Sequence, residues 1–126
     1  MNEMNRILVI DDNVDILQIV KVILENYGYE VLVTLNGEEV LTRADLFDPH
    51  LILMDVFLAA GIDGRDICRA LKSNDKTKDI PVIMFSAQSK MEDVLKSSCA
   101  DDFIAKPFEV KDLINKIQFH LSQHLN

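Results

Sequence analysis

Short apolar runs alternate five times with amphipathic stretches along this chain. The runs span residues 6–10, 29–35, 51–54, 80–85 and 102–105, and they are rich in Val, Ile and Leu. Short, nearly continuous apolar runs are typical of strands that are covered on both faces. The alternation predicts an α/β fold, a (βα)5 sandwich in which helices cover both faces of a five-stranded parallel sheet.

The stretches between and after these runs show the three- and four-residue spacing of α-helices. The apolar positions that recur in this way are Ile16, Val20, Ile23 and Tyr27, then Val40, Leu41 and Ala44, then Ile67 and Leu71, then Met91, Val94 and Leu95, and finally Val110, Leu113, Ile114, Ile117 and Leu121. Asn13, Asn36 and Ser89 are predicted N-caps, and Gly28 is a predicted helix stop.

A chain of 126 residues has the length of one domain, and no linker, repeat or low-complexity segment divides it. We expect residues 1–126 to form a single domain, with residues 1–4 as a flexible N-terminus. The longest apolar runs have four or five residues, whereas a helix that crosses a bilayer needs about 20. Residues 1–5 also lack the basic flank and apolar stretch of a signal peptide. These features predict a cytoplasmic protein without membrane contact.

The net charge of the chain disfavours some classes of binding partner. With 13 basic and 21 acidic residues the net charge is −8, whereas proteins that bind nucleic acids or anionic lipids use clustered Lys and Arg. We therefore expect no direct nucleic-acid binding by this chain, although a partner domain could supply it. Cys68 and Cys99 lack the spacing of a zinc site or a disulfide framework, so we interpret both as buried thiols on helix faces.

Polar residues follow four of the five predicted strands. Asp11 and Asp12 follow the first strand, Asp55 the third, Ser86 the fourth and Lys106 the fifth, whereas the second strand ends without a charge, as expected at a sheet edge. Ligands of open α/β sheets bind at the carboxyl ends of the strands. These side chains are therefore predicted to converge on one pocket.

Three carboxylates and one ammonium in such a pocket indicate phosphoryl chemistry. Neighbouring carboxylates raise one another's pKa unless a cation intervenes, and Mg²⁺ (or Mn²⁺) binds a few carboxylates while keeping water or phosphate oxygens. One carboxylate can then attack phosphorus, while the metal, the lysine and the serine hydroxyl contact the phosphoryl oxygens. These are the components of an aspartyl-phosphate site.

Five segments, in order and at matching spacing, resemble the response-regulator receiver domain of bacterial two-component signalling. They are ILVIDD (7–12), LILMD (51–55), GIDG (61–64), PVIMFSA (81–87) and ADDFIAKPF (100–108). Each segment alone has little specificity, but together they cover essentially the whole chain. The resemblance implies a flavodoxin-like, doubly wound sandwich with the strand order 2-1-3-4-5 that is known for this family.

The resemblance also implies a phosphoacceptor. Asp55 would take a phosphoryl group from a phosphohistidine of a histidine kinase or a histidine phosphotransfer protein, and Ser86 and Lys106 would contact the phosphate. The Lys106-Pro107 bond would be cis, a state accessible mainly to bonds before proline. Such a protein is no enzyme beyond catalysing its own phosphorylation and dephosphorylation.

The metal site that the resemblance implies uses four groups of this chain. Asp11 and Asp12 would hold Mg²⁺ together with the side chain of Asp55 and the backbone carbonyl of Phe57. The ligands are oxygen atoms, as Mg²⁺ prefers.

The switch implied by the resemblance consists of Ser86 and Phe103. Movement of Ser86 toward the phosphate would let the Phe103 ring turn inward and change the surface made by the predicted elements around residues 91–95, 102–105 and 110–121. We expect this surface to contact a downstream effector protein or domain, or a second copy of the receiver.

Three features depart from the usual receiver pattern. The loop FLAAGI (57–62) lacks the common Met-Pro, and Asp63-Gly64 comes one residue later than usual, so we expect the extra residue to bulge beyond Phe57 and leave its carbonyl in place. Phe103 cannot make the hydrogen bond that a tyrosine would. Cys99 replaces a usual glycine, which matters only where the backbone needs a positive φ.

Two other functions are open alternatives. A haloacid-dehalogenase-like phosphatase uses an Asp-x-Asp pattern after its first strand, whereas this chain has Asp11-Asp12-Asn13. A degenerate receiver that serves only as a protein-binding module usually lacks one of the acceptor-site residues, and all are present here.

His120 and His124 have the spacing of a helical metal pair but no acidic or cysteine neighbour in sequence. The cognate kinase, the signal and any further domains are not encoded in these motifs.

Overall fold

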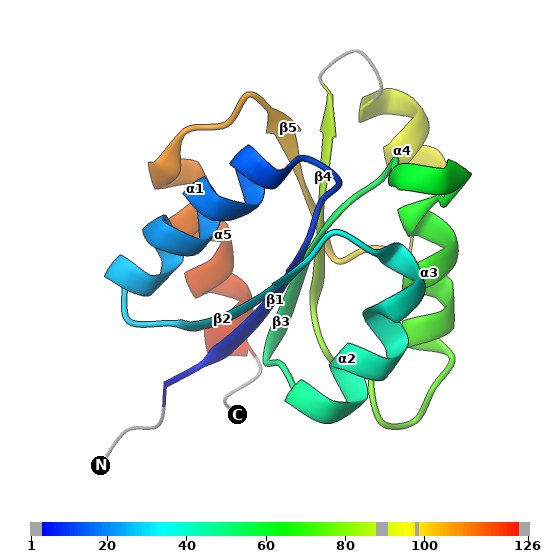
Figure 1. The fold of residues 1–126 in the computed structure, drawn as a ribbon, viewed down its shortest axis with the longest axis horizontal. Helices are drawn as coiled ribbons and strands as arrows, with labels where there is room; N and C mark the ends of the chain where they lie inside the picture. The colour runs from blue at the N-terminus through cyan, green and yellow to red at the C-terminus, as the bar shows by residue number, and fades with distance from the viewer. Residues whose placement is uncertain (1–3, 88–90, 98, 124–126) are drawn as a thin grey trace.

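Five parallel strands form one sheet between two layers of helices (Figure 1). The structure is a computed structural model that describes residues 4–87, 91–97 and 99–123. The strands are β1 (Arg6–Ile10), β2 (Glu30–Thr34), β3 (Leu51–Asp55), β4 (Val82–Ala87) and β5 (Asp102–Lys106), in the order β2-β1-β3-β4-β5. The predicted fold class and strand order are confirmed, and β2 lies at an edge as expected.

Helices cover both faces of this sheet (Figure 1). One face carries α1 (Val14–Asn26) and α5 (Val110–Gln123), and the other carries α2 (Val40–Phe47), α3 (Gly64–Lys72) and α4 (Met91–Ser97). Two short 3-10 helices, η1 (Gly37–Glu39) and η2 (Ala59–Gly61), are not among the predicted elements, because three residues are too few to show a periodic apolar pattern.

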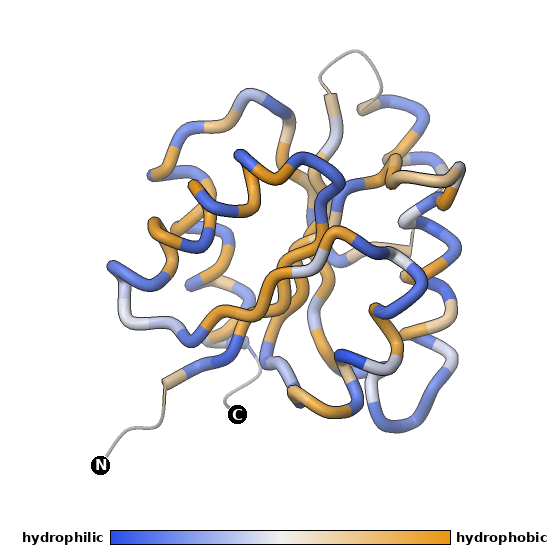
Figure 2. The backbone as a smooth tube through the Cα atoms, viewed as in Figure 1, coloured by the Kyte–Doolittle hydropathy of each residue, from blue (hydrophilic) through white to orange (hydrophobic). Residues whose placement is uncertain are grey.

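Alternating side chains of the strands supply the two halves of the core. On β1, Ile7 and Val9 pack against α1 and α5, while Leu8 and Ile10 pack on the opposite face, and all four are fully buried. Successive strand residues point to opposite faces, so a strand covered on both sides is apolar throughout. Figure 2 shows this apolar sheet between helices with polar outer positions. Burial stabilises the fold by about 1.5–3 kcal/mol for each such side chain.

Local side-chain signals set the helix ends. The Asn13 side chain caps α1 by accepting two hydrogen bonds from backbone N–H groups of its first turn (2.9 and 3.2 Å), and Asn36 accepts one at the start of η1 (2.9 Å). Gly28 follows α1 with a φ of +91°, which only glycine adopts readily. These predicted boundaries are confirmed, whereas the predicted cap at Ser89 lies outside the described residues.

Three of the apolar positions predicted to face the core are exposed instead. They are Tyr27 (52% exposed), Leu41 (44%) and Val110 (41%). Tyr27 lies just beyond the last residue of α1, and the other two lie in the first turns of α2 and α5. Helical spacing alone does not reveal how far the neighbouring sheet extends beneath a helix end.

No helix of residues 4–87, 91–97 and 99–123 is long and apolar enough to cross a membrane. The predicted flexible N-terminus falls on residues 1–4, of which residues 1–3 lie outside the described part. Met4, which is described, is about half exposed.

Candidate functional site

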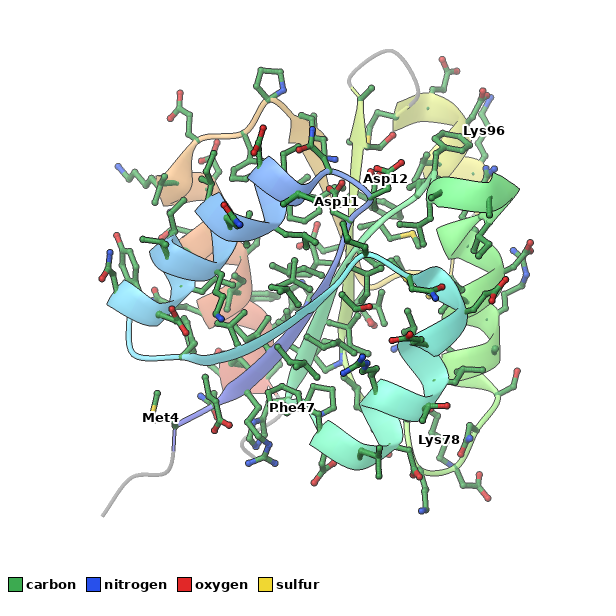
Figure 3. The ribbon with its side chains drawn as sticks, viewed as in Figure 1. Met4, Asp11, Asp12, Phe47, Lys78 and Lys96 are labelled. Carbon is green, nitrogen blue, oxygen red and sulfur yellow. The ribbon has the colours of Figure 1, made fainter. Side chains whose placement is uncertain are left out.

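The pairing of the strands brings the predicted site residues to one edge of the sheet. Ile10 pairs with Met54, so the next residues along these neighbouring strands, Asp11 and Asp55, emerge side by side. Figure 3 shows Asp11 and Asp12 at the carboxyl end of β1, opposite the end that Met4 precedes. The prediction that polar residues converge at the carboxyl ends of the strands is therefore confirmed for β1 and β3.

Lys106 joins Asp11 and Asp55 into one charged cluster. Its Nζ lies 2.7 Å from Asp11 Oδ2 and 3.1 Å from Asp55 Oδ2, across 95 and 51 residues of sequence. The side chain of Asp11 is fully buried, and those of Asp55 and Lys106 are 13% and 21% exposed. Nζ also lies 5.6 Å from the centre of the Phe85 ring, which stacks on Phe108. The Lys106-Pro107 bond is cis, as the resemblance implied.

Burial and charge shift the pKa values of this cluster. Burial, together with repulsion from Asp11, raises the pKa of the Asp55 carboxyl, although Lys106 opposes the shift. Burial by itself would lower the pKa of Lys106, but its contacts with Asp11 and Asp55 outweigh that effect and raise the pKa. Lys106 is therefore a stable cation, and the neighbouring carboxylates outnumber it.

The carboxylates fit a divalent metal ion. Asp11, Asp12 and Asp55 each offer one oxygen, and these three oxygens lie within 4.8 Å of one another. Asp12 is exposed, and Asp11 Oδ1 accepts a hydrogen bond from the backbone N–H of Asn13 (2.9 Å). An all-oxygen set that is open to water suits Mg²⁺ or Mn²⁺ better than softer metals.

The loop after β3 accommodates its extra residue in a tight turn. Phe57 and Asp63 form an isolated antiparallel bridge, and the N–H of Leu58 donates to the Ile62 carbonyl (2.9 Å). Between them lies η2, where Ala60 has a φ of +63°. The extra residue thus bulges beyond Phe57, as predicted. The backbone N–H of Phe57 hydrogen-bonds to the Asp55 carboxylate, whereas metal binding by its carbonyl stays a prediction.

Two residues near the loop have roles that the sequence did not reveal. Arg65 was not predicted to belong to the site, and no structural role was predicted for Gly64. The Arg65 guanidinium pairs with Asp63 (2.6 Å) and lies over the Phe57 ring, 5.6 Å from its centre. Gly64 belongs to the GIDG motif, and a Cβ on it would collide with the backbone carbonyl oxygen of Asp55. The motif signals this close approach, but the stacking of Arg65 depends on the loop conformation.

Ser86 lies on β4 and Phe103 lies on the neighbouring strand β5. Ser86 is fully buried near the end of β4, where it pairs with Ala105, and its hydroxyl donates to the Ala87 carbonyl (3.3 Å). Phe103 is half-buried against the core cluster that includes Val94 of α4. Both residues therefore stand where the resemblance places them, while their switching roles stay predictions.

The interpretation of both cysteines as buried thiols is wrong for one of them. Cys68 is fully buried in α3, but Cys99 is exposed in the segment before β5, and their sulfur atoms lie 3.0 Å apart. Positive φ among the described non-glycine residues occurs at Asp48 and Ala60, so Cys99 has an ordinary backbone. The apolar periodicity of the sequence could not predict that the two thiols are close together, because they belong to separate elements.

His120, one member of the histidine pair whose neighbours in sequence disfavour a metal site, contacts an aspartate of β5. Its Nε2 lies 2.9 Å from an Asp102 carboxylate oxygen, and the other Asp102 oxygen accepts a hydrogen bond from Lys116 (2.8 Å). His124 lies outside the described residues. The His120 ring thus has a structural partner on β5.

Comparisons with known proteins agree with this geometry. A family model described as the response regulator receiver domain matches residues 7–118. The DNA-binding dual master transcriptional regulator RpaA of Synechocystis sp. is 35% identical over 117 residues, which cover 91% of this chain and 48% of that protein. The chain spans about half the length of the curated relatives it matches.

Solved receiver structures share the fold. The signal receiver domain of a signal transduction histidine kinase from Syntrophus aciditrophicus is 34% identical with a TM-score of 0.87, and the match covers 95% of this chain and 92% of that one. The receiver domain of a sensor histidine kinase from Pseudomonas aeruginosa is 25% identical with a TM-score of 0.85 over 95% and 99% of the chains. Its structure is described as having a magnesium ion coordinated in the active site cleft.

Proposed function

The chain belongs to the response regulator receiver domain family, and from this premise we propose that Asp55 is its phosphoacceptor. The phosphoryl donor is a phosphohistidine of a histidine kinase or of a histidine phosphotransfer protein. One observation carries the proposal: Lys106 Nζ lies between the carboxylates of Asp11 and Asp55 at the carboxyl edge of the sheet. A carboxylate beside a cation and further carboxylates has the components needed for phosphoryl transfer.

In the proposed reaction an Asp55 carboxylate oxygen attacks phosphorus. The new oxygen–phosphorus bond forms as the phosphorus–nitrogen bond of the donor breaks, and the imidazole leaves and takes up a proton. Lys106 turns from Asp55 to a phosphoryl oxygen, and the Ser86 hydroxyl donates to another. Asp11, Asp12, Asp55 and the Phe57 carbonyl would hold a Mg²⁺ or Mn²⁺ ion, which would supply the remaining positive charge when bound.

The proposed partners are proteins. The net charge of −8 disfavours direct DNA contact by this chain, although the relative RpaA is named as DNA-binding. Family membership supports a cytoplasmic protein that receives phosphate from a kinase, passes its signal to an effector protein or domain, and catalyses only its own phosphorylation and dephosphorylation. A second receiver of the same kind is another candidate for the output contact.

We define the output surface as the exposed side of α4, β5 and α5. Phosphorylation would draw Ser86 away from the Ala87 carbonyl and open space behind β4, into which Phe103 could turn. Because the Phe103 ring is already half-buried, its further burial would yield only part of the about 1.5–3 kcal/mol of a full transfer. Such a gain biases the surface between two states without populating one completely.

Acetyl phosphate with Mg²⁺ tests the acceptor, because it needs no partner protein. Peptide mass spectrometry should find phosphate on Asp55, and Asp55→Asn should abolish it while the control Asp102→Asn retains it. Phosphate on Ser86 or on a histidine would contradict the proposal. A label on Asp11 with continuous turnover would favour the dehalogenase-like phosphatase, and no label at all would favour the degenerate receiver.

Backbone chemical shifts with and without beryllofluoride test the switch. We expect changes at Phe103 and along α4 as well as at the loops near Asp55. Ser86→Ala should keep the loop changes and lose those at Phe103, because the acceptor and the acidic cluster remain. Wild-type changes confined to the loops would contradict the coupling.

A further inference from the structure

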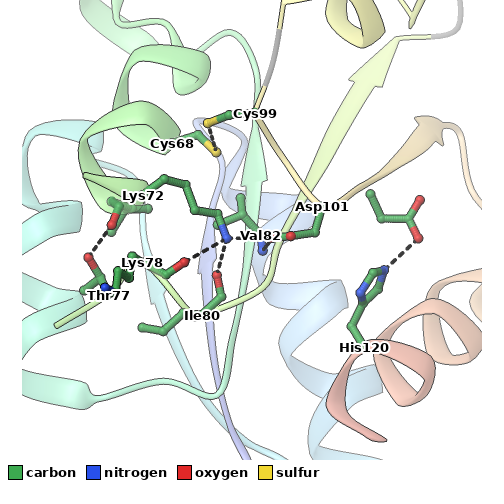
Figure 4. A network of polar contacts seen from close by, with 11 residues as sticks. Cys68, Lys72, Thr77, Lys78, Ile80, Val82, Cys99, Asp101 and His120 are labelled. Atoms are coloured by element: carbon green, nitrogen blue, oxygen red, sulfur yellow. Dashed lines mark hydrogen bonds and ion pairs between the residues drawn. The ribbon is translucent and has the colours of Figure 1, made fainter. Parts of the chain in front are cut away.

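Two cysteines that are far apart in sequence meet in the fold. Cys68 of α3 and Cys99 of the segment before β5 are separated by 31 positions, and their sulfur atoms lie 3.0 Å apart (Figure 4). A disulfide bond has a sulfur–sulfur distance of about 2.05 Å, so the atoms need to approach by only about 1 Å. Cys99 is exposed and Cys68 is fully buried behind it.

We propose that Cys68 and Cys99 form a reversible intramolecular disulfide when the chain meets a peroxide. The site is a modification site separate from the acidic cluster, and the proposal does not depend on phosphoacceptor function. Reversible, redox-sensing disulfides are the usual kind in compartments that keep thiols reduced. A pair with one exposed and one buried cysteine suits such a role, because the exposed residue meets the oxidant and the buried thiol completes the bond.

A polar network holds the two segments together beside the sulfur atoms (Figure 4). Lys72, one helical turn after Cys68, pairs with the Asp101 carboxylate (2.8 Å) and also donates to the Ile80 carbonyl (2.8 Å). Asp101 lies two residues after Cys99. Its carboxylate accepts a hydrogen bond from the Val82 N–H, and its backbone N–H donates one to the Val82 carbonyl (2.8 Å each). Both cysteines are therefore anchored within a few residues, which lowers the entropy cost of joining them.

The chemistry balances with hydrogen peroxide as the oxidant. The Cys99 thiol first releases its proton to solvent, and the thiolate attacks one peroxide oxygen. The oxygen–oxygen bond breaks, which gives a sulfenic acid and a hydroxide that takes up the released proton and becomes the first water. The Cys68 sulfur then attacks the Cys99 sulfur, the sulfur–oxygen bond breaks, and the hydroxide leaves as a second water with the Cys68 proton. The two thiols lose two electrons and the peroxide gains them. A dithiol reverses the reaction by thiol–disulfide exchange.

The order of attack follows from the surroundings of the thiols. Burial, and then the contact with Cys99, raises the pKa of the Cys68 thiol. The thiolate is the reactive form, so Cys68 is inert toward an external oxidant. Oxidation of Cys99 replaces its ionisable thiol and presents an electrophilic sulfur next to Cys68.

The experiment treats the intact wild-type chain with hydrogen peroxide and then blocks free thiols with an alkylating agent under denaturing conditions. We expect both thiols to disappear together, with a mass loss of two hydrogens, a linked Cys68–Cys99 peptide, and recovery of both thiols after dithiothreitol. A product with Cys99 oxidised or linked to another chain while Cys68 stays alkylatable would overturn the proposal. Two free thiols after treatment would overturn it as well.

Two single-cysteine variants show which thiol reacts first and which thiol completes the bond. In Cys99→Ser, Cys68 should remain reduced at peroxide concentrations that oxidise wild type. In Cys68→Ala, Cys99 should proceed to sulfinic acid or to a bond between chains, since no neighbouring thiol intercepts the sulfenic acid. If Cys68→Ala left the products at Cys99 unchanged, the buried thiol would have no part in the reaction.

Discussion

Asp55 and Asp102 are both strand-end aspartates that contact a lysine, yet their pKa values are shifted in opposite directions. Asp55 ends β3, where burial and then Asp11 raise its pKa although Lys106 opposes the shift. Asp102 is the first residue of β5 and therefore lies at the amino ends of the parallel strands, opposite the carboxyl ends where Asp55 lies. Burial disfavours its ionised form too, but hydrogen bonds from Lys116 and His120 outweigh burial and lower its pKa.

The two sites differ in the number of side-chain partners for each carboxylate. Asp55 shares one lysine with Asp11, and Asp12 places a third carboxylate oxygen within 4.8 Å. Asp102 contacts Lys116 at 2.8 Å and His120 at 2.9 Å by itself. The first cluster holds more negative than positive charge and is suited to bind a further cation, whereas the Asp102 carboxylate has its partners within the chain and connects β5 to α5. Stability measurements can test this contrast directly.

The largest expected difference lies between the two lysines. Lys106→Met leaves buried Asp11 and Asp55 without their cation, and we expect a loss of about 3 kcal/mol in the free energy of unfolding without metal. Lys116→Met should cost only about 1 kcal/mol, because its pair with Asp102 is more exposed. Urea unfolding in EDTA measures both. Equal losses would contradict the contrast.

Mg²⁺ should distinguish the two clusters almost as strongly. At a hundred times its Kd, the ion should stabilise the wild type by about 2.7 kcal/mol. Asp12→Ala should lose most of this gain while its metal-free form stays at least as stable as wild type, since the variant relieves repulsion. Asp102→Ala should keep the gain. Equal melting temperatures of the wild type with and without Mg²⁺ would count against the metal site.

Replacing each aspartate by asparagine should change stability in opposite directions. In metal-free buffer Asp102→Asn should lower the free energy of unfolding by about 1–2 kcal/mol, because charge-assisted hydrogen bonds are lost. Asp55→Asn should raise it, because a disfavoured buried charge is removed. The measurement is chemical unfolding at neutral pH. Two changes of the same sign would show that both carboxylates serve the same structural role.

The smallest effect is the pH dependence of these two changes. A lowered pKa means that ionised Asp102 stabilises the fold above its ordinary value near 3.8, and that this contribution is lost as the pH falls through the folded-state pKa. A raised pKa means that ionised Asp55 destabilises the metal-free fold above its folded-state pKa, and that this cost disappears as the pH falls toward 3.8. Both differences from wild type should therefore shrink toward zero on acidification. A difference that grows on acidification would contradict the assigned direction.

The residues at the strand ends illustrate what could be predicted from the sequence. Asp11, Asp55 and Lys106 each follow or end an apolar run, and parallel strands bring their carboxyl ends to one edge. Their convergence follows from the order of elements alone, and the structure has Lys106 in contact with both carboxylates. The lowered pKa of Asp102 could not be predicted in this way, because it depends on Lys116 and His120 approaching from another element.

The sequence by itself determined the α/β alternation, most element boundaries and the set of polar residues at the rim, because these depend on periodicity and local capping. Only the tertiary structure decided which side chains touch across elements. Cys68 and Cys99 meet although no spacing relates them, Arg65 stacks on Phe57, and Gly64 lies against the Asp55 carbonyl. Such contacts depend on how separate elements pack and on side-chain rotamers, and local patterns encode neither.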